Sequence, residues 1–425
     1  MKILWVTAAP IGPASRILDC PYKGTSGGWV QNIYEEIEHN ADNQMSFLCF
    51  DKKIKLGSEK YARTQEGEAY CFHMPQVSFG RKAPKKLKRQ VEDVILKIKP
   101  DIIQIWGTET CVQNMIAQCA PDISKVVFIQ GIIGIHERYR GGGLDKLNLH
   151  CSMNLKEKII DCIKRKNFSI QAQLEQQEIN ACKNVIIDNV FTLSYCEKLK
   201  EKINTYYYHL VANKVFYDKE WSIHNCSEYS VFTVFSGGPD KGLHQLLRAI
   251  EIVKRRIPKV KVFIPGIYHL EKDKLSSNVK KLTPYERLLT NLIKELDIED
   301  NVVFCGKLSM YQMAERLASS HIFVNPSCME IHASSLREAM AVGVPSISTY
   351  CGSVGEYVIE GVNGFLYRYE EHEVLAHKMY NLLTNANLAS EISRNAKEQM
   401  GKYREHSQNE SILKIYEQII ERKKI

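Results

Sequence analysis

The strongest constraint on the fold is a repeated alternation of short apolar runs with longer amphipathic stretches. The runs expected to form strands are Lys2–Thr7, Ser46–Phe50, Ile102–Ile105, Val126–Gln130, Asn184–Asp188, Val231–Phe235, Val260–Pro265, Val302–Gly306, Ile322–Asn325 and Ser346–Thr349. The stretches expected to form helices include Trp29–Glu38, Lys85–Ile98, Leu243–Arg256, Pro284–Leu296, Met310–Ala318 and Ser335–Val342. Strands alternating with helices in this way are typical of parallel, doubly wound sheets in α/β proteins.

The alternation occurs twice along the chain. One series fills the first half and a second begins near Val231, with an irregular aromatic stretch from Tyr206 to Asn225 between them. We therefore expect two facing Rossmann-like domains with parallel sheets, residues 1–210 and 211–405. A final amphipathic helix in 406–425 is expected to pack back onto the first domain. Because ligands of open α/β sheets bind beyond the carboxyl ends of the strands, the pattern predicts a ligand cleft between the domains.

The composition excludes several other classes of protein. The chain has 425 residues, of which 44% are hydrophobic and 25% are charged, which is ordinary for a globular protein. This excludes a disordered tail, a collagen-like fibre and a coiled-coil rod. No apolar run is long enough for a membrane-spanning helix. The short apolar run at the amino terminus favours a buried strand over a signal peptide.

The cysteines and histidines indicate a reducing compartment and no metal site. The 13 cysteines are scattered without a C-x-x-C pair, so we interpret them as buried free thiols of a cytoplasmic protein. The 13 histidines also lack metal-ligand spacing, and no H-E-x-x-H occurs. We therefore expect neither a metal nor another bound cofactor.

Two phosphate-binding motifs of doubly wound folds are missing. Neither G-x-G-x-x-G nor G-x-x-x-x-G-K-[ST] occurs after the first strand, which argues against a dehydrogenase and an NTPase. Gly27 and Gly28 stand there instead, just before an expected helix whose free N–H groups could bind an anion. The alternative is a plain loop that turns into a helix, with Ser26 as its cap.

A second glycine-containing turn opens the second series. The stretch from Phe235 to Gly242 lies between an expected strand and an expected helix, and it contains Ser236, Gly237, Gly238 and Lys241. A lysine held at this turn could neutralise a phosphate group in the cleft. The alternative is a surface turn with a solvated lysine.

The clearest candidate for chemistry is the loop and helix that follow the strand ending at Asn325. Glu330 lies in the loop and Glu338 follows near the start of the expected helix. Carboxylates suit sugar and ribose hydroxyls, and the N–H groups of the loop and helix suit a diphosphate. Ser335 and Glu338 also match a capping box, with Glu338 at the third helical position. Glu330 has no such structural explanation.

These residues resemble retaining glycosyltransferase family four. The resemblance rests on Glu330 and Glu338 as a Glu-x(7)-Glu motif, with Pro326-Ser327 before it and Gly343-Val344-Pro345 after it. The turns at Lys241-Gly242 and Asn363-Gly364 also fall where this family has them. The resemblance is specific over roughly 230–370. It implies the GT-B fold, in agreement with the two domains expected from the alternation.

The resemblance also implies roles for individual residues. Glu338 would bind the ribose hydroxyls of a nucleoside diphosphate sugar, Glu330 would contact the donor sugar, and Lys241 would hold the diphosphate. The backbone of Gly306, Lys307 and Leu308 would frame the base. The amides of Ser334, Ser335 and Leu336, together with Gly27 and Gly28, would face the phosphates. The family generally needs no metal, and positioning and stabilisation of the departing diphosphate would carry the catalysis.

Two positions depart from the family pattern. The family commonly has an arginine five residues before the lysine of the phosphate turn, where this chain has Ser236. Members often have a histidine after a first-domain strand, where this chain has Gln130, which can form hydrogen bonds but carries no charge. His136 is an alternative candidate there, although it also fits a histidine on a helix surface.

A basic segment marks the expected acceptor domain. Residues 80–89 contain six lysine or arginine side chains and begin an amphipathic helix. This helix could contact an anionic membrane that carries lipid-linked acceptors, or it could be a solvated helix face. Nucleic acid is not expected as a partner, because no aromatic pattern accompanies the charges.

The sequence thus predicts a metal-independent retaining glycosyltransferase of surface polysaccharide or lipopolysaccharide synthesis, cytoplasmic or at the inner face of the membrane. Its partners would be a nucleotide-sugar donor and a glycan or lipid-linked glycan acceptor. The candidate catalytic residues are Glu330, Gln130 and Lys241. Two alternatives remain: a nucleotide-sugar epimerase of the same fold, and a non-catalytic GT-B subunit that binds donor or scaffolds a partner.

Overall fold

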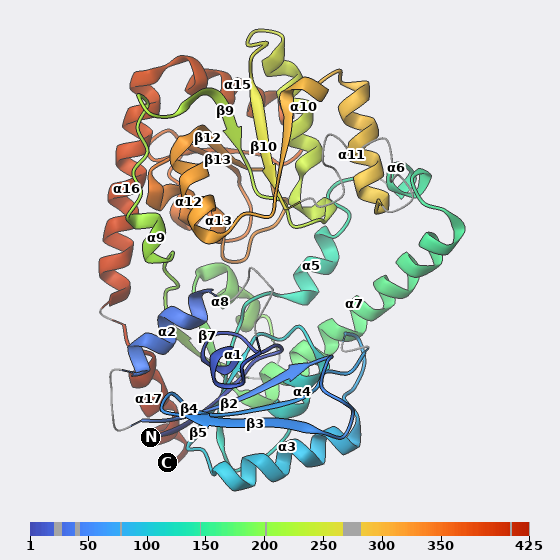
Figure 1. The fold of residues 1–425 in the computed structure, drawn as a ribbon, viewed down its shortest axis with the longest axis vertical. Coiled ribbons are helices and arrows are strands. Elements are labelled where there is room, and N and C mark those ends of the chain that lie inside the picture. Colours follow the sequence, from blue (N-terminus) through green and yellow to red (C-terminus); the bar gives the residue numbers. More distant parts are fainter. Residues whose placement is uncertain are drawn as a thin grey trace. The chain divides into compact units, whose positions relative to one another are not determined.

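The computed structural model describes residues 1–20, 28–38, 43–76, 79–144, 146–199, 202–266, 282–408 and 410–424. The chain forms two compact units (Figure 1). Unit 1 comprises Met1–Glu137, Cys162–Leu210 and Ser407–Ile425, and unit 2 comprises Arg138–Asp161 and Val211–His406. The chain therefore crosses between the units more than once, and the continuous helix α7 (Leu155–Cys182) contains residues of both.

Unit 1 is built on a sheet whose described strands run in the order β3-β4-β2-β1-β5-β6-β7-β8. They are β1 (Lys2–Val6), β2 (Gln44–Asp51), β3 (Glu59–Thr64), β4 (Gly67–His73), β5 (Ile102–Trp106), β6 (Ser124–Phe128), β7 (Asn184–Ile187) and β8 (Asn204–Tyr207). Six of the seven neighbouring pairs are parallel, as predicted. The pair β3–β4 is antiparallel, which the prediction of parallel sheets missed. Only Gln65 and Glu66 connect these strands, and a parallel pair needs a much longer crossover.

The helices of unit 1 enclose a core that includes the last helix of the chain. They are α1 (Pro13–Ile17), α2 (Gly28–Glu38), α3 (Lys85–Ile98), α4 (Cys111–Ala117), α8 (Val190–Glu197) and α17 (Ile412–Lys424), with parts of α5 (Ile133–Tyr139) and α7. Helix α17 contacts α2 and β6. The indole of Trp5 donates a hydrogen bond to the hydroxyl of Tyr416 over 3.1 Å, and both side chains are buried. The first strand and the last helix therefore share one core.

Unit 2 is built on a parallel sheet with the described strand order β11-β10-β9-β12-β13-β14. The strands are β9 (Ser227–Phe232), β10 (Lys261–Pro265), β11 (Val302–Gly306), β12 (Ser320–Asn325), β13 (Ser346–Thr349) and β14 (Phe365–Tyr367). The helices are α6 (Lys146–Cys151), α9 (Lys214–Tyr217), α10 (Leu243–Lys254), α11 (Pro284–Glu295), α12 (Met310–Ser319), α13 (Ser334–Val342), α14 (Val354–Tyr357), α15 (His372–Thr384) and α16 (Ala386–Gln408), with the short helices η1 (Pro239–Lys241) and η4 (Glu299–Asn301).

One stretch of chain has more regular structure than its sequence suggested. Tyr206 and Tyr207 lie in β8, whereas the sequence predicted an irregular connection there. Strand β8 pairs in parallel with β7 and is the last strand of its sheet. The residues of β8 are partly buried or exposed, so they lack the continuous apolar pattern of a strand that is buried on both faces. Aromatic residues nevertheless favour strands, which explains the observed structure.

Two global features complete the description. The helices of the described residues include none with the length and apolar composition that crossing a bilayer requires. The described residues include all 13 cysteines, and none of them forms a disulfide.

Candidate functional site

The sheet topology of unit 2 selects one place for a ligand. Strands β9 and β12 are neighbours, and the strand order proceeds outward from them in opposite directions. At such a switch point the loops that follow the two strands lead to opposite sides of the sheet, which leaves a crevice between them. Ligands of open α/β sheets bind in this crevice, beyond the carboxyl ends of the strands. The loop after β9 contains Lys241, and the loop after β12 contains Glu330. The topology therefore places two of the predicted residues at this position.

Lys241 and Glu330 form an ion pair at the switch point. The Lys241 Nζ atom lies 2.8 Å from Oε1 of Glu330, and both side chains are largely buried. Burial acts to lower the pKa of Lys241, but the neighbouring Glu330 carboxylate more than offsets it, so that the pKa is raised. Lys241 therefore keeps its positive charge at a position from which most water is excluded.

The two loops also meet through their backbones. The amide of Cys328 donates a hydrogen bond to the carbonyl of Asp240 over 2.8 Å. Gly242 has φ of 66°, and a Cβ atom at this position would lie 1.9 Å from the carbonyl oxygen of Pro326. Only glycine adopts this conformation and approach without strain. Gly242 thus allows the turn that carries Lys241 to pack directly against the loop that carries Glu330.

A buried network supports the other side of the turn. The hydroxyl of Tyr369 donates to the carbonyl of Gly142 over 2.7 Å and lies 3.3 Å from Nε2 of His244. A Cβ atom on Gly142 would lie 2.1 Å from the carbonyl oxygen of Pro239, so this segment contacts the turn itself. Burial, with a contribution from Arg248, lowers the pKa of His244 to about 4, which leaves its ring neutral near pH 7. The Lys241 turn is therefore in contact with the Glu330 loop on one side and with the Gly142 segment on the other, all within unit 2.

Helix α13 carries the second predicted carboxylate and begins differently from the prediction. Its N-cap is Ala333, in a left-handed conformation and without a side-chain cap, so the capping box predicted for Ser335 and Glu338 is wrong. Glu338 is the fifth helical residue rather than the third, too far along the helix to cap its first turn. Burial raises the pKa of Glu338 to about 7, although Arg337 opposes the shift. Helix capping therefore gives no structural explanation for Glu338.

The other donor-site residues predicted in unit 2 lie at the same edge of the sheet. Ser236, Gly237 and Gly238 follow β9, and Gly306 ends β11, with Lys307 and Leu308 after it. Ser334, Ser335 and Leu336 form the first turn of α13. Gly237 and Gly306 have positive φ angles, and a Cβ atom on either would meet no atom of the described residues within 4 Å. The described part of the chain thus leaves room beside both glycines.

The residues predicted from the first half of the chain belong to unit 1. Gly28 is the first residue of α2, whereas Gly27 lies outside the described residues. Gln130 follows β6 and is half-buried, and His136 lies in α5. The structure thus joins Lys241 to Glu330 directly and assigns Gln130, Gly28 and His136 to the other unit.

Unit 1 has an acidic residue at its own switch point that the sequence interpretation missed. Strands β1 and β5 are the neighbours from which the order reverses, and Glu109 follows β5 by three positions. Burial raises the pKa of Glu109 to about 7, against hydrogen bonds that lower it. A Cβ atom on Gly131 would lie 3.3 Å from Glu109 Oε1 and 3.8 Å from His136 Nε2. The sequence signal that could have identified Glu109 is the polar stretch Gly107-Thr108-Glu109 directly after the apolar run of β5.

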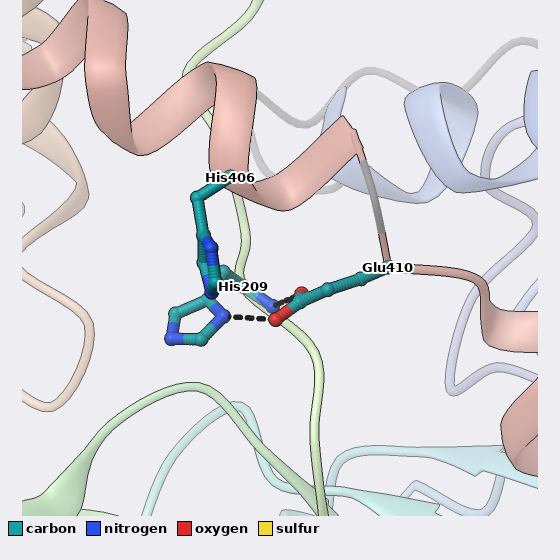
Figure 2. Close-up of side chains that lie close together, drawn as sticks. All are labelled: His209, His406 and Glu410. Atoms are coloured by element: carbon teal, nitrogen blue, oxygen red, sulfur yellow. Dashed lines mark hydrogen bonds and ion pairs between the residues drawn. The ribbon is translucent and has the colours of Figure 1, made fainter.

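A histidine and a glutamate near the ends of the unit 1 segments form a separate pair (Figure 2). The backbone N–H of His209 donates to Oε2 of Glu410 over 2.6 Å, and the ring Nδ1 of His209 contacts the other carboxylate oxygen. Figure 2 also draws His406, the last residue of the unit 2 range. The pair therefore joins the unit 1 segment that ends at Leu210 to the final segment of that unit, which begins at Ser407.

The sequence of the site matches a known family. Residues 222–399 match the family described as Glycosyl transferases group 1. The matched segment is less than half of the chain. It includes Lys241, Glu330 and Glu338, so the ion pair and α13 both lie within it.

Curated relatives match part of the chain. The chain is 34% identical over 131 residues to N-acetyl-alpha-D-glucosaminyl L-malate synthase of Bacillus anthracis, an alignment that covers 31% of this chain and 33% of that protein. It is 28% identical over 181 residues to the putative colanic acid biosynthesis glycosyltransferase WcaL of Escherichia coli, covering 41% of this chain and 40% of the relative. The chain thus aligns with about a third to two fifths of these relatives.

Solved structures match nearly the whole chain. Sucrose-phosphate synthase from Thermosynechococcus elongatus superposes with a TM-score of 0.72 at 13% identity, covering 99% of both chains. Anabaena HepE in complex with UDP and glucose superposes with a TM-score of 0.64 at 17% identity, covering 99% of this chain and 98% of HepE. These likenesses show the fold, which is the two-domain α/β GT-B fold predicted from the sequence.

Proposed function

We propose that this protein is a retaining glycosyltransferase that moves a sugar from a nucleoside diphosphate sugar to a glycan or lipid-linked glycan. The observation that carries the proposal is the largely buried Lys241–Glu330 pair, at the switch point within the segment that matches the group 1 family. A fixed cation there suits a leaving diphosphate, and a carboxylate beside it suits the hydroxyls of the sugar. No second function is favoured by a comparable observation.

The proposed donor has three parts, and each has candidate partners. Lys241 and the uncapped first turn of α13, Ser334 to Leu336, would hold the diphosphate. Glu338 would accept hydrogen bonds from the ribose, and the backbone at Gly306 would border the base. HepE has been crystallised with UDP and with UDP-glucose, which supports UDP-sugars as the first donors to test.

The proposed reaction relies on positioning and electrostatics. Lys241 would neutralise the negative charge that develops as the bond from the sugar to the diphosphate breaks, so we propose transfer without a metal. Glu330 would orient the donor sugar, with Gln130 of unit 1 as a further hydrogen-bonding group. For a retaining reaction, the departing phosphate would accept the proton of the acceptor hydroxyl on the same face of the sugar.

The proposed acceptor belongs to surface polysaccharide or lipopolysaccharide synthesis. WcaL is described as a putative enzyme of colanic acid biosynthesis, and CapM of Staphylococcus aureus, 24% identical over 161 residues, as an enzyme of capsular polysaccharide biosynthesis. These relatives support a growing glycan or a lipid-linked glycan as acceptor. We place the reaction in the cytoplasm, at the inner face of the membrane.

The proposal is tested by Glu330→Gln and Lys241→Met. Each variant removes one charge of the pair, and we expect turnover of the donor to fall by about 100-fold, a typical cost of losing a preorganised electrostatic contact. The measurement is release of nucleoside diphosphate and of glycosylated product, with donors first selected by thermal shift. The matched control is the exposed pair Lys219–Glu315, 3.3 Å apart in the same unit, where Lys219→Met and Glu315→Gln should leave turnover unchanged.

Three outcomes would contradict the proposal. Normal turnover in both Glu330→Gln and Lys241→Met would show that the site is wrong. Donor binding without turnover by the wild type, across a broad acceptor panel, would support the non-catalytic alternative. Nucleoside diphosphate release with an altered sugar and no acceptor product would support an epimerase.

The pKa of Glu338 predicts how donor affinity depends on pH. The pKa of its carboxyl group is raised to about 7, so the carboxylate that accepts the two ribose hydrogen bonds is lost as the pH falls below that value. If only the ionised form binds well, the donor KM should rise about tenfold between pH 8 and pH 6. Glu338→Gln should bind donor more weakly and independently of pH. Glu330→Gln should keep the pH dependence, and a flat wild-type profile would argue against the ribose contact.

A further inference from the structure

The first half of helix α7 presents large apolar side chains to solvent. Leu155, Ile159 and Ile163 are 76%, 54% and 55% exposed, among the most exposed large apolar side chains of the described residues. They are spaced four residues apart, and residues at this spacing lie on one face of an α-helix. The helix therefore has a continuous apolar stripe, defined by these three residues, that no described part of the chain covers.

The charges of α7 are separated between its faces. At 100° per residue, Lys156 falls on one side of the apolar stripe and Lys158 on the other, and both side chains are exposed. The acidic residues Glu157 and Asp161 fall on the opposite face. There Oε2 of Glu157 lies 2.6 Å from a guanidinium nitrogen of Arg287, and Asp161 forms an ion pair with Arg140. The outward face is thus apolar with cationic flanks, and the acids are turned inward and neutralised.

This arrangement is that of a helix lying in a membrane interface. An amphipathic helix of this kind buries its apolar stripe at the boundary of headgroups and acyl chains, while flanking lysines contact anionic lipids. We propose that the face of α7 formed by Leu155, Ile159, Ile163, Lys156 and Lys158 binds the surface of an anionic lipid bilayer. The proposal is independent of the proposed reaction and concerns a surface outside the Lys241 site.

Two other assignments fit the observations less well. Helix α3, which contains part of the basic segment 80–89, buries its apolar residues Leu87, Val91 and Ile95 in its own unit, so it offers mainly charge. A second copy of the chain packed isologously on α7 would bring the lysine flanks of the two copies together. Like charges repel, whereas anionic lipid complements them, and the lipid surface is therefore the favoured occupant.

The test is flotation of the full-length protein with vesicles of phosphatidylglycerol and phosphatidylcholine, compared with vesicles of phosphatidylcholine alone. We expect the wild type to bind the anionic vesicles and to be released by high salt. Ile159→Ser with Ile163→Ser should weaken binding by about tenfold or more, since two exposed apolar anchors are lost. Lys156→Glu with Lys158→Glu should abolish the preference for anionic vesicles.

Matched controls distinguish binding through this face of α7 from non-specific binding of vesicles by any exposed apolar side chain. Leu96 on α3 and Ile359 in unit 2 are 68% and 56% exposed, and serine at either position should leave vesicle binding unchanged. All variants should keep wild-type nucleoside diphosphate release with a soluble acceptor, so a failure of this proposal is distinguishable from a failure of the proposed reaction. The proposal is overturned if the wild type does not bind anionic vesicles, or if the α7 variants bind them normally. It is also overturned if the α7 variants instead convert an oligomer to a monomer by analytical ultracentrifugation.

Discussion

Gly352→Ala should reduce donor turnover by about 100-fold while leaving the protein folded, because a displacement near 1 Å in a catalytic group has an effect of this size. Gly352 has φ of 51°, and a Cβ atom there would lie 1.8 Å from the carbonyl oxygen of Glu330. The next residue, Ser353, donates its N–H to the same carbonyl over 3.0 Å. An alanine would therefore push Glu330 away and separate its carboxylate from Lys241. The measurement is nucleoside diphosphate release at saturating donor, with a thermal unfolding curve for each variant.

Gly361→Ala is the matched control for this experiment. Gly361 has φ of 72°, so alanine introduces a similar backbone strain, but a Cβ atom there would meet no atom of the described residues within 4 Å. Both variants should lose a similar amount of stability from backbone strain, and only Gly352→Ala should lose turnover. Equal turnover in the two variants would show that activity does not depend on the placement of Glu330.

Glu178→Gln should stabilise the protein at pH 8 by about 1.4 kcal/mol or more, the free energy of one unit of pKa shift, because glutamine does not titrate. Glu178 lies in α7, is fully buried, and its carboxylate oxygens have no hydrogen-bond partner among the described residues. Burial, together with Glu109 and Glu175, raises its pKa well above the usual range. Glutamine keeps the shape of the side chain and removes the charge that forms at high pH.

The pH dependence of this effect follows from the direction of the shift. An acid whose pKa is raised in the folded state contributes stability below its unfolded pKa, about 4.3, and loses it as the pH rises towards the folded value. The gain from Glu178→Gln should therefore be small at pH 5 and grow towards pH 8, as measured by the difference in Tm from the wild type. His244, whose pKa is lowered, acts in the opposite direction between about pH 4 and 6.5, but it is common to both proteins and cancels.

Glu398→Gln is the control for the stability experiment. Glu398 is exposed and pairs with Lys402 four residues along the same helix, so the variant should leave the pH dependence of Tm close to that of the wild type. The difference in Tm between Glu178→Gln and the wild type is the quantity to compare. If this difference is the same at pH 5 and pH 8, the prediction is contradicted, because stability would not depend on the titration of Glu178.

The missed features share a physical cause. Strand β3 is exposed on most of its residues and β8 lies at a sheet edge, so neither shows a continuous apolar pattern. The capping box at Ser335 and Glu338 satisfied the local rule, yet the N-cap is Ala333, with a left-handed backbone, two residues before the predicted cap. Cap position depends on the backbone that precedes the helix. Glu109 was missed because its environment includes Gly131 and Glu175 of α7, which are distant from it in the sequence.

The sequence by itself determined the two α/β series and the identity of Lys241, Glu330 and Glu338 as candidates, because hydrophobic period and the position of a residue after a strand are local properties of the chain. The GT-B fold was what the resemblance of these motifs to a family implied. Only the tertiary structure decided that Lys241 and Glu330 form an ion pair, since they are 89 positions apart and meet through the adjacency of β9 and β12. It also decided which face of α7 is left uncovered. Exposure depends on what packs against a helix, and the packing partners Arg140 and Arg287 lie in other elements of the chain.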